Sequence, residues 1–356
     1  MIASSYDKRI GITSWDSSIA DLVRLPEPIE LDSLAVLPSQ TRELKNITRI
    51  LIGGARKGGV IYTLSPTLEL LEEEKISSQT FGGTTFIKVF NSGNYDIVIS
   101  GVSGNLLLMI YEKKGGIISK KIIPRDGTPV EATLHSYDRE ILLAVADIGS
   151  RKITVYSLSF SKHEIVPEIE HEFRIDNNPA FIRFIERGKK ELLLIIGDRK
   201  GKISLRKING EKIWSQFIGI PLTWRRVLIN DINNDGELEF IVGCQAGEED
   251  ISKKSISPIF ILNNNGEVIA KTTTKGWIKD FRLIEENGKK FLLVISGKRL
   301  YLFSLENSLK EQKITKFDKP IWSIDLLTEK DIINVILGFA DGELGFARIE
   351  NETIVI

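Results

Sequence analysis

The sequence is poor in the residues that carry covalent and metal chemistry. It contains one cysteine, Cys244, and three scattered histidines. A single cysteine excludes an intrachain disulfide, a CxxC redox pair and a cysteine-rich metal site. No two histidines have the spacing of metal ligands. Cys244 ends the apolar run 240–244, which predicts a small buried side chain rather than a reactive thiol.

The chain also lacks net charge, long apolar runs and a recognisable leader. Its 48 lysines and arginines balance 48 aspartates and glutamates, which argues against nucleic acid as a partner and against a polybasic membrane anchor. No run approaches the roughly 18 apolar residues of a membrane span, so no membrane insertion is expected. Residues 1–7 show no basic region followed by an apolar core, so we expect no signal peptide and a cytoplasmic location. The many Ile, Lys and Glu residues favour a thermophilic source.

What the chain does contain is a repeat. Short apolar runs recur about every 40–50 residues and are usually followed by glycine. The seven runs begin at Ile50, Ile97, Leu142, Leu193, Phe240, Leu292 and Val335. A strand-like segment precedes each run, such as 181–185, and an alternating segment follows it, such as 203–205. Most repeats end in a more polar segment, such as 212–215.

Four short strands per repeat at this period predict a β-propeller blade. We therefore predict an all-β fold with one propeller domain over residues 1–356. The seven four-stranded blades are expected at about 31–81, 82–127, 128–177, 178–220, 221–276, 277–318 and 319–356. Residues 1–30 contain two more strand-like segments, which would close the ring as outer strands beside residues 319–356 and so remove open sheet edges. Eight blades with an incomplete first one is the alternative.

One loop has the pattern of a cation site. Residues 231–239 read Asp-Ile-Asn-Asn-Asp-Gly-Glu-Leu-Glu, which places oxygen ligands at Asp231, Asn233, Asp235 and Glu239. Calcium takes about six to eight oxygen ligands, and a glycine at the sixth place allows a sharp turn. An EF-hand would need a glutamate at its twelfth position, which is Val242 here. The apolar runs on both sides predict that the loop joins two strands, and a hairpin turn without metal is the alternative.

These parts together resemble the FG-GAP repeat, the propeller repeat of integrin α-subunits and related proteins. The resemblance is carried by segments 81–83 with 94–101, 52–56 with 59–62, and above all 231–243. It implies one bound calcium ion, held by the side chains of Asp231, Asn233, Asp235 and Glu239 and by the carbonyl of Glu237. The corresponding loops 91–96 and 186–191 depart from the pattern, so a single site is expected. Residues 209–214 are similar to the Gly-to-Trp element of quinoprotein-type propellers in one copy only.

Aromatic and basic residues recur two positions apart in the first strand of several repeats. The pairs are Phe86 with Lys88, Phe181 with Arg183, Trp224 with Arg226, and Trp277 with Lys279, and Trp322 adds a further aromatic. Period two places both members of a pair on one face of the strand. Around the central channel of a propeller they could hold an acidic peptide, a phosphate or a nucleotide. The alternative is structural, with the aromatics between blades and the bases extended to solvent.

The leading functional prediction is a non-enzymatic protein-interaction scaffold, either a monomeric propeller or a subunit of a hetero-complex, with one structural calcium. The alternatives are a propeller enzyme of the lyase, lactonase or glycosidase type, and a binder of an anionic ligand or nucleic acid. An enzyme would need histidines or paired carboxylates on the inner strands, where the sequence offers mainly Glu131, Asp280 and Asp325. It contains no Gly-x-Ser-x-Gly elbow, and the glycine-rich stretch 53–59 lacks the ending of a P-loop.

Overall fold

The described part of the chain consists of strands joined by turns and loops. The computed structural model describes residues 2–4, 9–13, 19–24, 29–37, 49–54, 59–76, 84–92, 95–102, 104–112, 117–137, 140–161, 164–188, 191–218, 222–244, 256–306, 309–329, 332–339 and 343–355. These residues form strands β1–β31 and no helix. They divide into two compact units, residues 1–195 with 206–211 and residues 196–205 with 212–356.

The first unit begins with a three-stranded antiparallel sheet and continues with three four-stranded antiparallel sheets. The small sheet is made of β1 (Ile2–Ser4), β2 (Arg9–Thr13) and β3 (Ile19–Arg24). The four-stranded sheets are made of β4 (Ile29–Leu37), β5 (Arg49–Gly54), β6 (Val60–Leu64), β7 (Leu70–Lys75); β8 (Thr84–Ser92), β9 (Tyr95–Val102), β10 (Asn105–Glu112), β11 (Ile117–Pro124); and β12 (Thr128–Tyr137), β13 (Glu140–Ile148), β14 (Lys152–Ser161), β15 (Glu164–Arg174).

A fourth four-stranded sheet follows along the chain, and three more lie in the second unit. The fourth sheet is made of β16 (Pro179–Arg187), β17 (Glu191–Asp198), β18 (Lys202–Lys207) and β19 (Lys212–Phe217). The others are made of β20 (Leu222–Asn230), β21 (Glu239–Cys244), β22 (Ile256–Leu262), β23 (Val268–Lys275); β24 (Ile278–Glu286), β25 (Lys289–Ser296), β26 (Arg299–Ser304), β27 (Lys310–Lys316); and β28 (Ile321–Glu329), β29 (Ile332–Phe339), β30 (Leu344–Glu350), β31 (Thr353–Val355).

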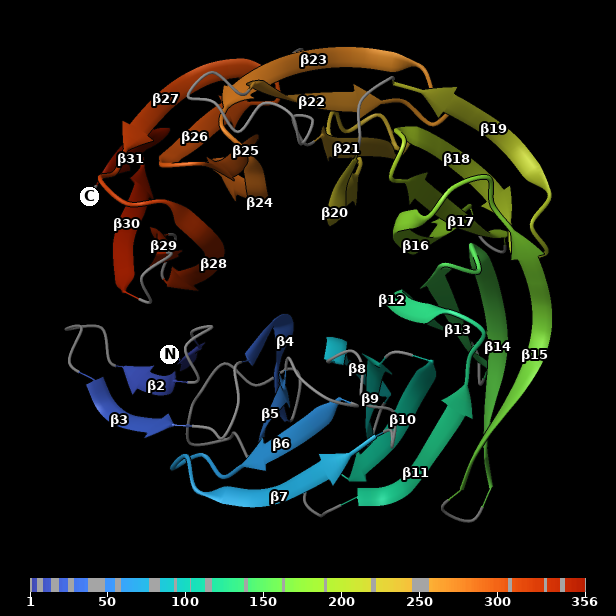
Figure 1. The fold of residues 1–356 in the computed structure, drawn as a ribbon. Coiled ribbons are helices and arrows are strands. Elements are labelled where there is room, and N and C mark those ends of the chain that lie inside the picture. Colours follow the sequence, from blue (N-terminus) through green and yellow to red (C-terminus); the bar gives the residue numbers. More distant parts are fainter. Residues whose placement is uncertain are drawn as a thin grey trace. The chain divides into compact units, whose positions relative to one another are not determined.

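The predicted all-β class and the seven four-stranded antiparallel sheets are confirmed. In each of these sheets the strands pair in the order of the sequence (Figure 1). The N-terminal strands differ from the expectation, because β1, β2 and β3 pair with one another as a separate sheet. They do not supply the outer strands of the C-terminal sheet, since β31 already pairs with the outer edge of β30. The eight-bladed alternative counts this small sheet as the incomplete blade.

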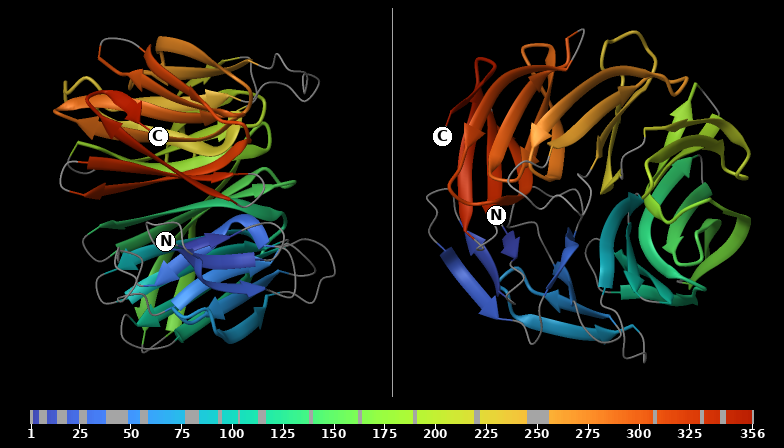
Figure 2. Two further views of the ribbon diagram at one scale, coloured as in Figure 1. Left: turned by 90° about the vertical axis from the view of Figure 1, so that its left-hand side faces the viewer. Right: turned by 45° about the horizontal axis from the view of Figure 1, so that its top comes forward.

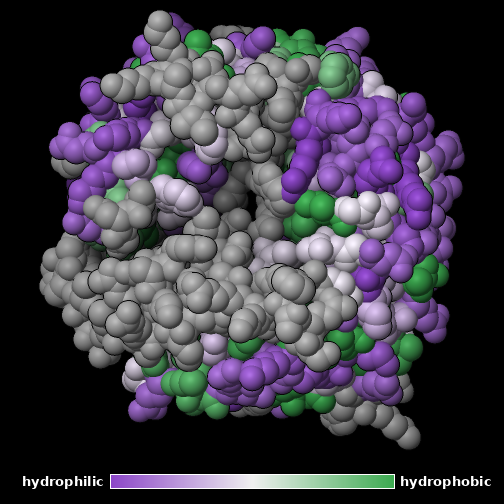
Figure 3. Space-filling model, in the orientation of Figure 1, coloured by the Kyte–Doolittle hydropathy of each residue, from purple (hydrophilic) through white to green (hydrophobic). Residues whose placement is uncertain are grey.

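The position of a strand in its sheet decides its composition. The second strands β9, β21 and β25 are buried along almost their whole length, which matches their apolar runs. The fourth strands β7, β19 and β27 are largely exposed and polar. Figure 3 shows mostly polar surface over the outer strands, with isolated apolar residues. The pattern places the core between neighbouring sheets and the fourth strand at the solvent.

Core clusters within each unit extend over two neighbouring sheets. In the first unit one cluster joins Phe86, Ile99 and Leu108 of the β8–β11 sheet to Val145 and Tyr156 of the β12–β15 sheet. In the second unit, clusters join β20–β23 to β24–β27 and β24–β27 to β28–β31. These three sheets of the second unit stack face to face in Figure 2. Each sheet therefore depends on a neighbour to bury its apolar faces.

An ionic cluster also connects neighbouring sheets of the first unit. Arg125 follows β11, and its Nε donates to Asp147 Oδ2 of β13 at 3.1 Å. Its Nη2 donates to the same carboxylate and to Thr154 Oγ1, and its Nη1 donates to the Tyr156 hydroxyl. The Arg125 side chain is 4% exposed and that of Asp147 is fully buried. Burial raises the pKa of Asp147, and the guanidinium opposes this rise.

Replacing Arg125 by methionine leaves the Asp147 charge buried without its counter-ion. We expect Arg125→Met to lower the free energy of unfolding by about 3–5 kcal/mol, the usual cost of breaking one side of a buried pair. Denaturant titration measures the change. The matched control is Lys121→Met, which removes an exposed pair with Glu164 at 3.7 Å and should cost less than about 1 kcal/mol. Equal effects of the two substitutions would contradict a supporting role for Arg125.

Cys244 is a fully buried thiol, as its apolar surroundings predicted. Burial raises its pKa to about 12, and the thiolate is the reactive form. We expect the folded protein at pH 8 to react with Ellman's reagent only on the time scale of unfolding. In guanidinium chloride one thiol per chain should react within minutes. Rapid reaction of the native chain would show that the thiol is accessible.

Candidate functional site

The acidic loop joins β20 to β21, as predicted, and its own backbone satisfies most of its oxygens. The Asp231 carboxylate accepts hydrogen bonds from the backbone N–H groups of Asp235 at 3.1 Å and Gly236 at 2.9 Å. Asn233 Oδ1 accepts from the Asp235 N–H at 3.1 Å, and Asp235 Oδ1 accepts from the Glu237 N–H at 2.8 Å. Gly236 has a φ of +89°, which explains the glycine at this place.

Glu239 is the buried carboxylate of the loop. It begins β21, is 3% exposed, and accepts a hydrogen bond from the Ile232 N–H at 2.7 Å. Burial raises the pKa of Glu239, the Ile232 N–H lowers it, and the charges of Asp235 and Asp231 raise it further. Positive charge at this place would therefore stabilise the loop.

Lys290 of β25 supplies part of that charge. Its ammonium donates to the backbone carbonyl of Asp231 and to Asn234 Oδ1, the latter at 2.6 Å. Lys290 thus lowers the pKa of Glu239, although less than the other causes change it. No local sequence pattern indicated this contact, because the lysine lies 59 residues from Asp231.

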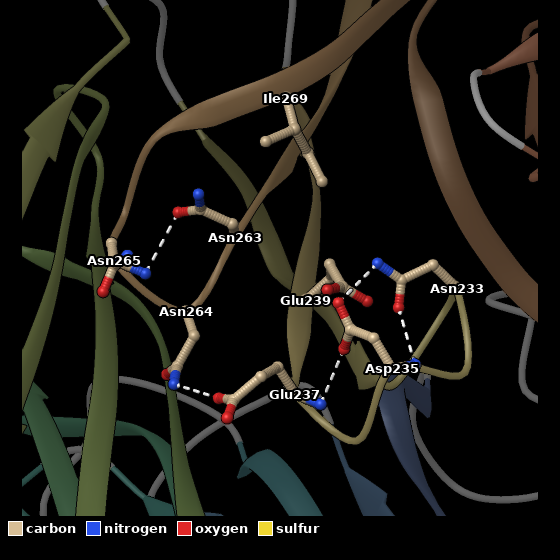
Figure 4. A pocket seen from close by; sticks show the side chains of 8 residues that line it. All are labelled: Asn233, Asp235, Glu237, Glu239, Asn263, Asn264, Asn265 and Ile269. Carbon is tan, nitrogen blue, oxygen red and sulfur yellow. Dashed lines mark hydrogen bonds between the residues drawn. The ribbon is translucent and has the colours of Figure 1, made fainter.

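The loop lines a polar pocket with a volume of about 530 Å³. Figure 4 shows the loop on one side of the pocket and the turn between β22 and β23 on the other. The turn contributes Asn263, Asn264 and Asn265, and Asn264 Nδ2 donates to Glu237 Oε2 at 2.6 Å. The Glu237 side chain is therefore engaged by the turn, a contact that the sequence pattern did not indicate.

The loop has the oxygen ligands that calcium prefers, but its carboxylates are not placed around a common point. Carboxylate and amide oxygens are the ligands that calcium prefers. However, the part of the chain that the structure describes contains no group of three or more His, Cys, Asp or Glu side chains placed to hold a metal ion. A cation would have to compete with the backbone hydrogen bonds at Asp231, Asp235 and Glu239. The assignment of Asp231, Asn233, Asp235, Glu237 and Glu239 as ligands stays a prediction.

In the first unit the aromatic residues of the predicted pairs are buried, and the bases contact a buried carboxylate. Phe86 and Phe181 are at most 1% exposed and lie in the core. Lys88 donates to the Ala132 carbonyl at 2.8 Å and forms an ion pair with Glu131. Arg183 lies 3.2 Å from the same carboxylate, which is fully buried. Phe86 and Phe181 thus fill the core, as the structural alternative has it, but Lys88 and Arg183 pair with a buried acid rather than extending to solvent.

The second unit contains a different arrangement, which we name the Trp–Lys cluster and define as Trp277, Lys279 and Trp322. The Lys279 Nζ atom lies 5.3 Å from the ring centroid of Trp277 and 4.3 Å from that of Trp322. Trp322 is 42% exposed, whereas Trp277 and Lys279 are half-buried. Burial lowers the pKa of Lys279. Trp224 and Arg226 lie on β20, but their side chains are outside the described part of the chain.

β-Bulges explain how the cluster forms. The first strand carries one extra residue near its start in β24 and in β28, namely Lys279 and Trp322. A bulge bends the strand and re-aims the extra side chain. The two-residue period that paired Trp277 with Lys279 in the sequence is therefore broken at Lys279, and the contact with Trp322 comes from the neighbouring strand. Strands β8 and β12 carry corresponding bulges at Thr85 and Val130.

The inner-strand carboxylates are occupied by structural contacts. Asp280 is 2% exposed and accepts hydrogen bonds from Arg282 and from the Phe281 N–H. Glu131 is held by two bases, as described above. Asp325 is exposed and accepts a hydrogen bond from the Leu326 N–H at 2.9 Å. The bases beside Glu131 and Asp280 thus give these two carboxylates a structural role.

Comparison with known proteins bears on the fold alone. No protein-family model matches the chain, and no curated protein sequence matches it. Among solved structures, the dihydro-heme d1 dehydrogenase NirN in complex with DHE has a TM-score of 0.69 at 10% identity, over 100% of this chain and 72% of that chain. BamB from Moraxella catarrhalis has a TM-score of 0.58 at 12% identity, over 97% and 92%.

A third similar structure is BBS1N in complex with ARL6DN, with a TM-score of 0.53 at 13% identity, over 83% of each chain. The Dos1 propeller has a TM-score of 0.59 at 14% identity, over 99% of this chain and 87% of that one. Within its described residues the chain has no helix that could cross a membrane. The similarity to these structures, together with the seven four-stranded sheets, shows that the fold is a β-propeller.

Proposed function

We propose that this chain is a non-enzymatic β-propeller that binds a protein partner, as a scaffold or as a subunit of a complex. The observation that carries the proposal is the Trp–Lys cluster, in which the 42% exposed Trp322 lies beside a half-buried cation. Tryptophan is enriched at the centres of protein interfaces, because it buries a large rigid surface at low entropic cost. An exposed tryptophan on a strand is therefore a good anchor for a partner.

Two further observations support a binding role over catalysis. The buried carboxylates Glu131 and Asp280 are paired with bases, which engages two of the three inner-strand carboxylates that could serve in acid–base catalysis. Among similar folds, BBS1N was solved in complex with ARL6DN, so a propeller of this general kind can carry a protein partner. NirN is described as a dehydrogenase, so the propeller fold occurs in enzymes too, and the proposal rests on the side chains rather than on the fold.

We also propose that the acidic loop binds one calcium ion with a structural role. The supporting observation is Glu239, a buried carboxylate near Asp231 and Asp235 whose charge is only partly balanced by Lys290. A divalent cation would relieve this repulsion and hold the β20–β21 hairpin.

Calcium should therefore stabilise the wild-type chain. After treatment with chelator, saturating calcium should raise the midpoint of thermal unfolding by several degrees, because a ligand at about a hundred times its Kd adds roughly 2.7 kcal/mol. Glu239→Gln keeps an acceptor for the Ile232 N–H and should abolish the response. Glu311→Gln, an exposed glutamate on β27, is the control and should respond as wild type does. An unchanged midpoint with calcium and with chelator would rule out the site.

The scaffold proposal is tested by affinity capture of partners from extract of the source organism. The double substitution Trp277→Ala and Trp322→Ala should remove the captured protein. Phe217→Ala on β19 is the matched control, since Phe217 is an aromatic residue that is 64% exposed away from the cluster. Capture that is equal for both variants, or absent with the wild-type chain, would contradict the proposal. Thermal unfolding of each variant shows that the fold is retained.

A further inference from the structure

We infer that the Trp–Lys cluster recognises an acidic segment of a protein partner, with a carboxylate of the segment on Lys279 and neighbouring side chains against the two indoles. The inference rests on the proposed function and specifies the chemistry of the partner. Its basis is the contrast between Lys279 and the other bases on the first strands.

Every other first-strand base with a described side chain has a carboxylate of this chain beside it. Lys88 and Arg183 share Glu131, and Arg282 pairs with Asp280. Arg187, further along β16, pairs with Glu191 at 2.6 Å. Lys279 has no carboxylate within ion-pair distance among the described residues. The acids on nearby strand positions are engaged elsewhere, because Asp280 is held by Arg282 and Asp325 accepts from its neighbouring backbone.

The surroundings of Lys279 favour a carboxylate over water. Lys279 is half-buried, which lowers the pKa of its ammonium, and among the described residues no carboxylate forms an ion pair with it. The two indole faces stabilise the cation, but an indole has no acceptor atom for the N–H groups of the ammonium. A carboxylate would supply both the negative charge and the acceptor, in a charge-assisted hydrogen bond with a cation that is already positioned.

The size and position of the cluster favour a peptide over nucleic acid. Nucleic-acid binding needs several cations that each neutralise a phosphate, and the chain has no net positive charge. The cluster offers one cation without an acidic partner and two apolar rings. Trp277 directly precedes β24, Lys279 lies on β24 and Trp322 lies on the neighbouring β28, so an extended segment can contact the three side chains at once. An acidic residue flanked by apolar ones matches this arrangement.

The test measures binding of two fluorescein-labelled peptides to the full chain by fluorescence anisotropy. One peptide contains aspartate and glutamate spaced by leucine, and the other contains asparagine and glutamine in the same places. We expect the acidic peptide to bind and the amide peptide to bind at least tenfold more weakly. Binding of the acidic peptide should weaken as salt is raised, since the contact is ionic. Equal binding of the two peptides would overturn the inference.

Variants of Lys279 locate the contact. Lys279→Met should weaken binding of the acidic peptide by roughly tenfold or more, whereas Lys279→Arg should retain most of it. Lys313→Met, an exposed lysine on β27, is the control and should bind as wild type does. Unchanged binding by Lys279→Met would overturn the inference, as would a single-stranded oligonucleotide that binds more tightly than the peptide through Lys279. The arginine variant and the salt dependence of the wild type test the idea even if the methionine variant is unstable.

The outcomes also separate this inference from the proposed function. If the two tryptophans are needed to capture a partner but Lys279 is not needed for the acidic peptide, the chain is a scaffold with a different recognition chemistry. If the acidic peptide binds through Lys279 but no protein is captured from extract, the recognition chemistry holds and the scaffold role fails.

Discussion

The second strand of most of the four-stranded sheets needs apolar cover on both of its faces, and no sheet can provide this alone. Strands such as β9, β21 and β25 are buried almost from end to end. Within each unit the core clusters accordingly extend over two sheets. Repetition of one sheet unit is the solution, because every repeat presents its neighbour with the face that the neighbour must cover. The fourth strand pairs with a neighbouring strand on one edge only and is largely exposed, so it is polar.

The first strands differ from the second strands in composition, and the proposed binding site lies on them. They contain buried polar groups among apolar ones, so each buried charge needs a partner. Glu131 meets this need for two bases at once, and Asp280 meets it for Arg282. Lys279 is the exception, because its ammonium lies against two aromatic rings in place of a carboxylate. The site that we propose for a partner thus lies where the pairing of buried charges stops among the described first strands.

Much of the fold followed from the sequence, because burial on both faces produces uninterrupted apolar runs that recur with the repeat. The same runs placed the acidic loop correctly between β20 and β21. The bulges at Lys279 and Trp322 could not be foreseen, since one extra residue in a strand changes register without changing composition. Local sequence patterns also did not predict the contact of Lys290 with the loop, which joins segments far apart in the sequence. Nor did they predict that β1–β3 pair with one another rather than with the C-terminal sheet.

Lys290 also determines how the acidic loop opens. A hairpin loop stabilised only by its own backbone can fray while the strands beside it stay folded. Here the carbonyl of Asp231 and the amide of Asn234 are both attached to a lysine on β25, a strand of the next sheet. Opening the loop therefore means detaching it from that sheet as well as breaking its own turns. Hydrogen exchange at the Asp235 and Gly236 amides consequently reports on the cohesion of two sheets, although both amides belong to an exposed turn.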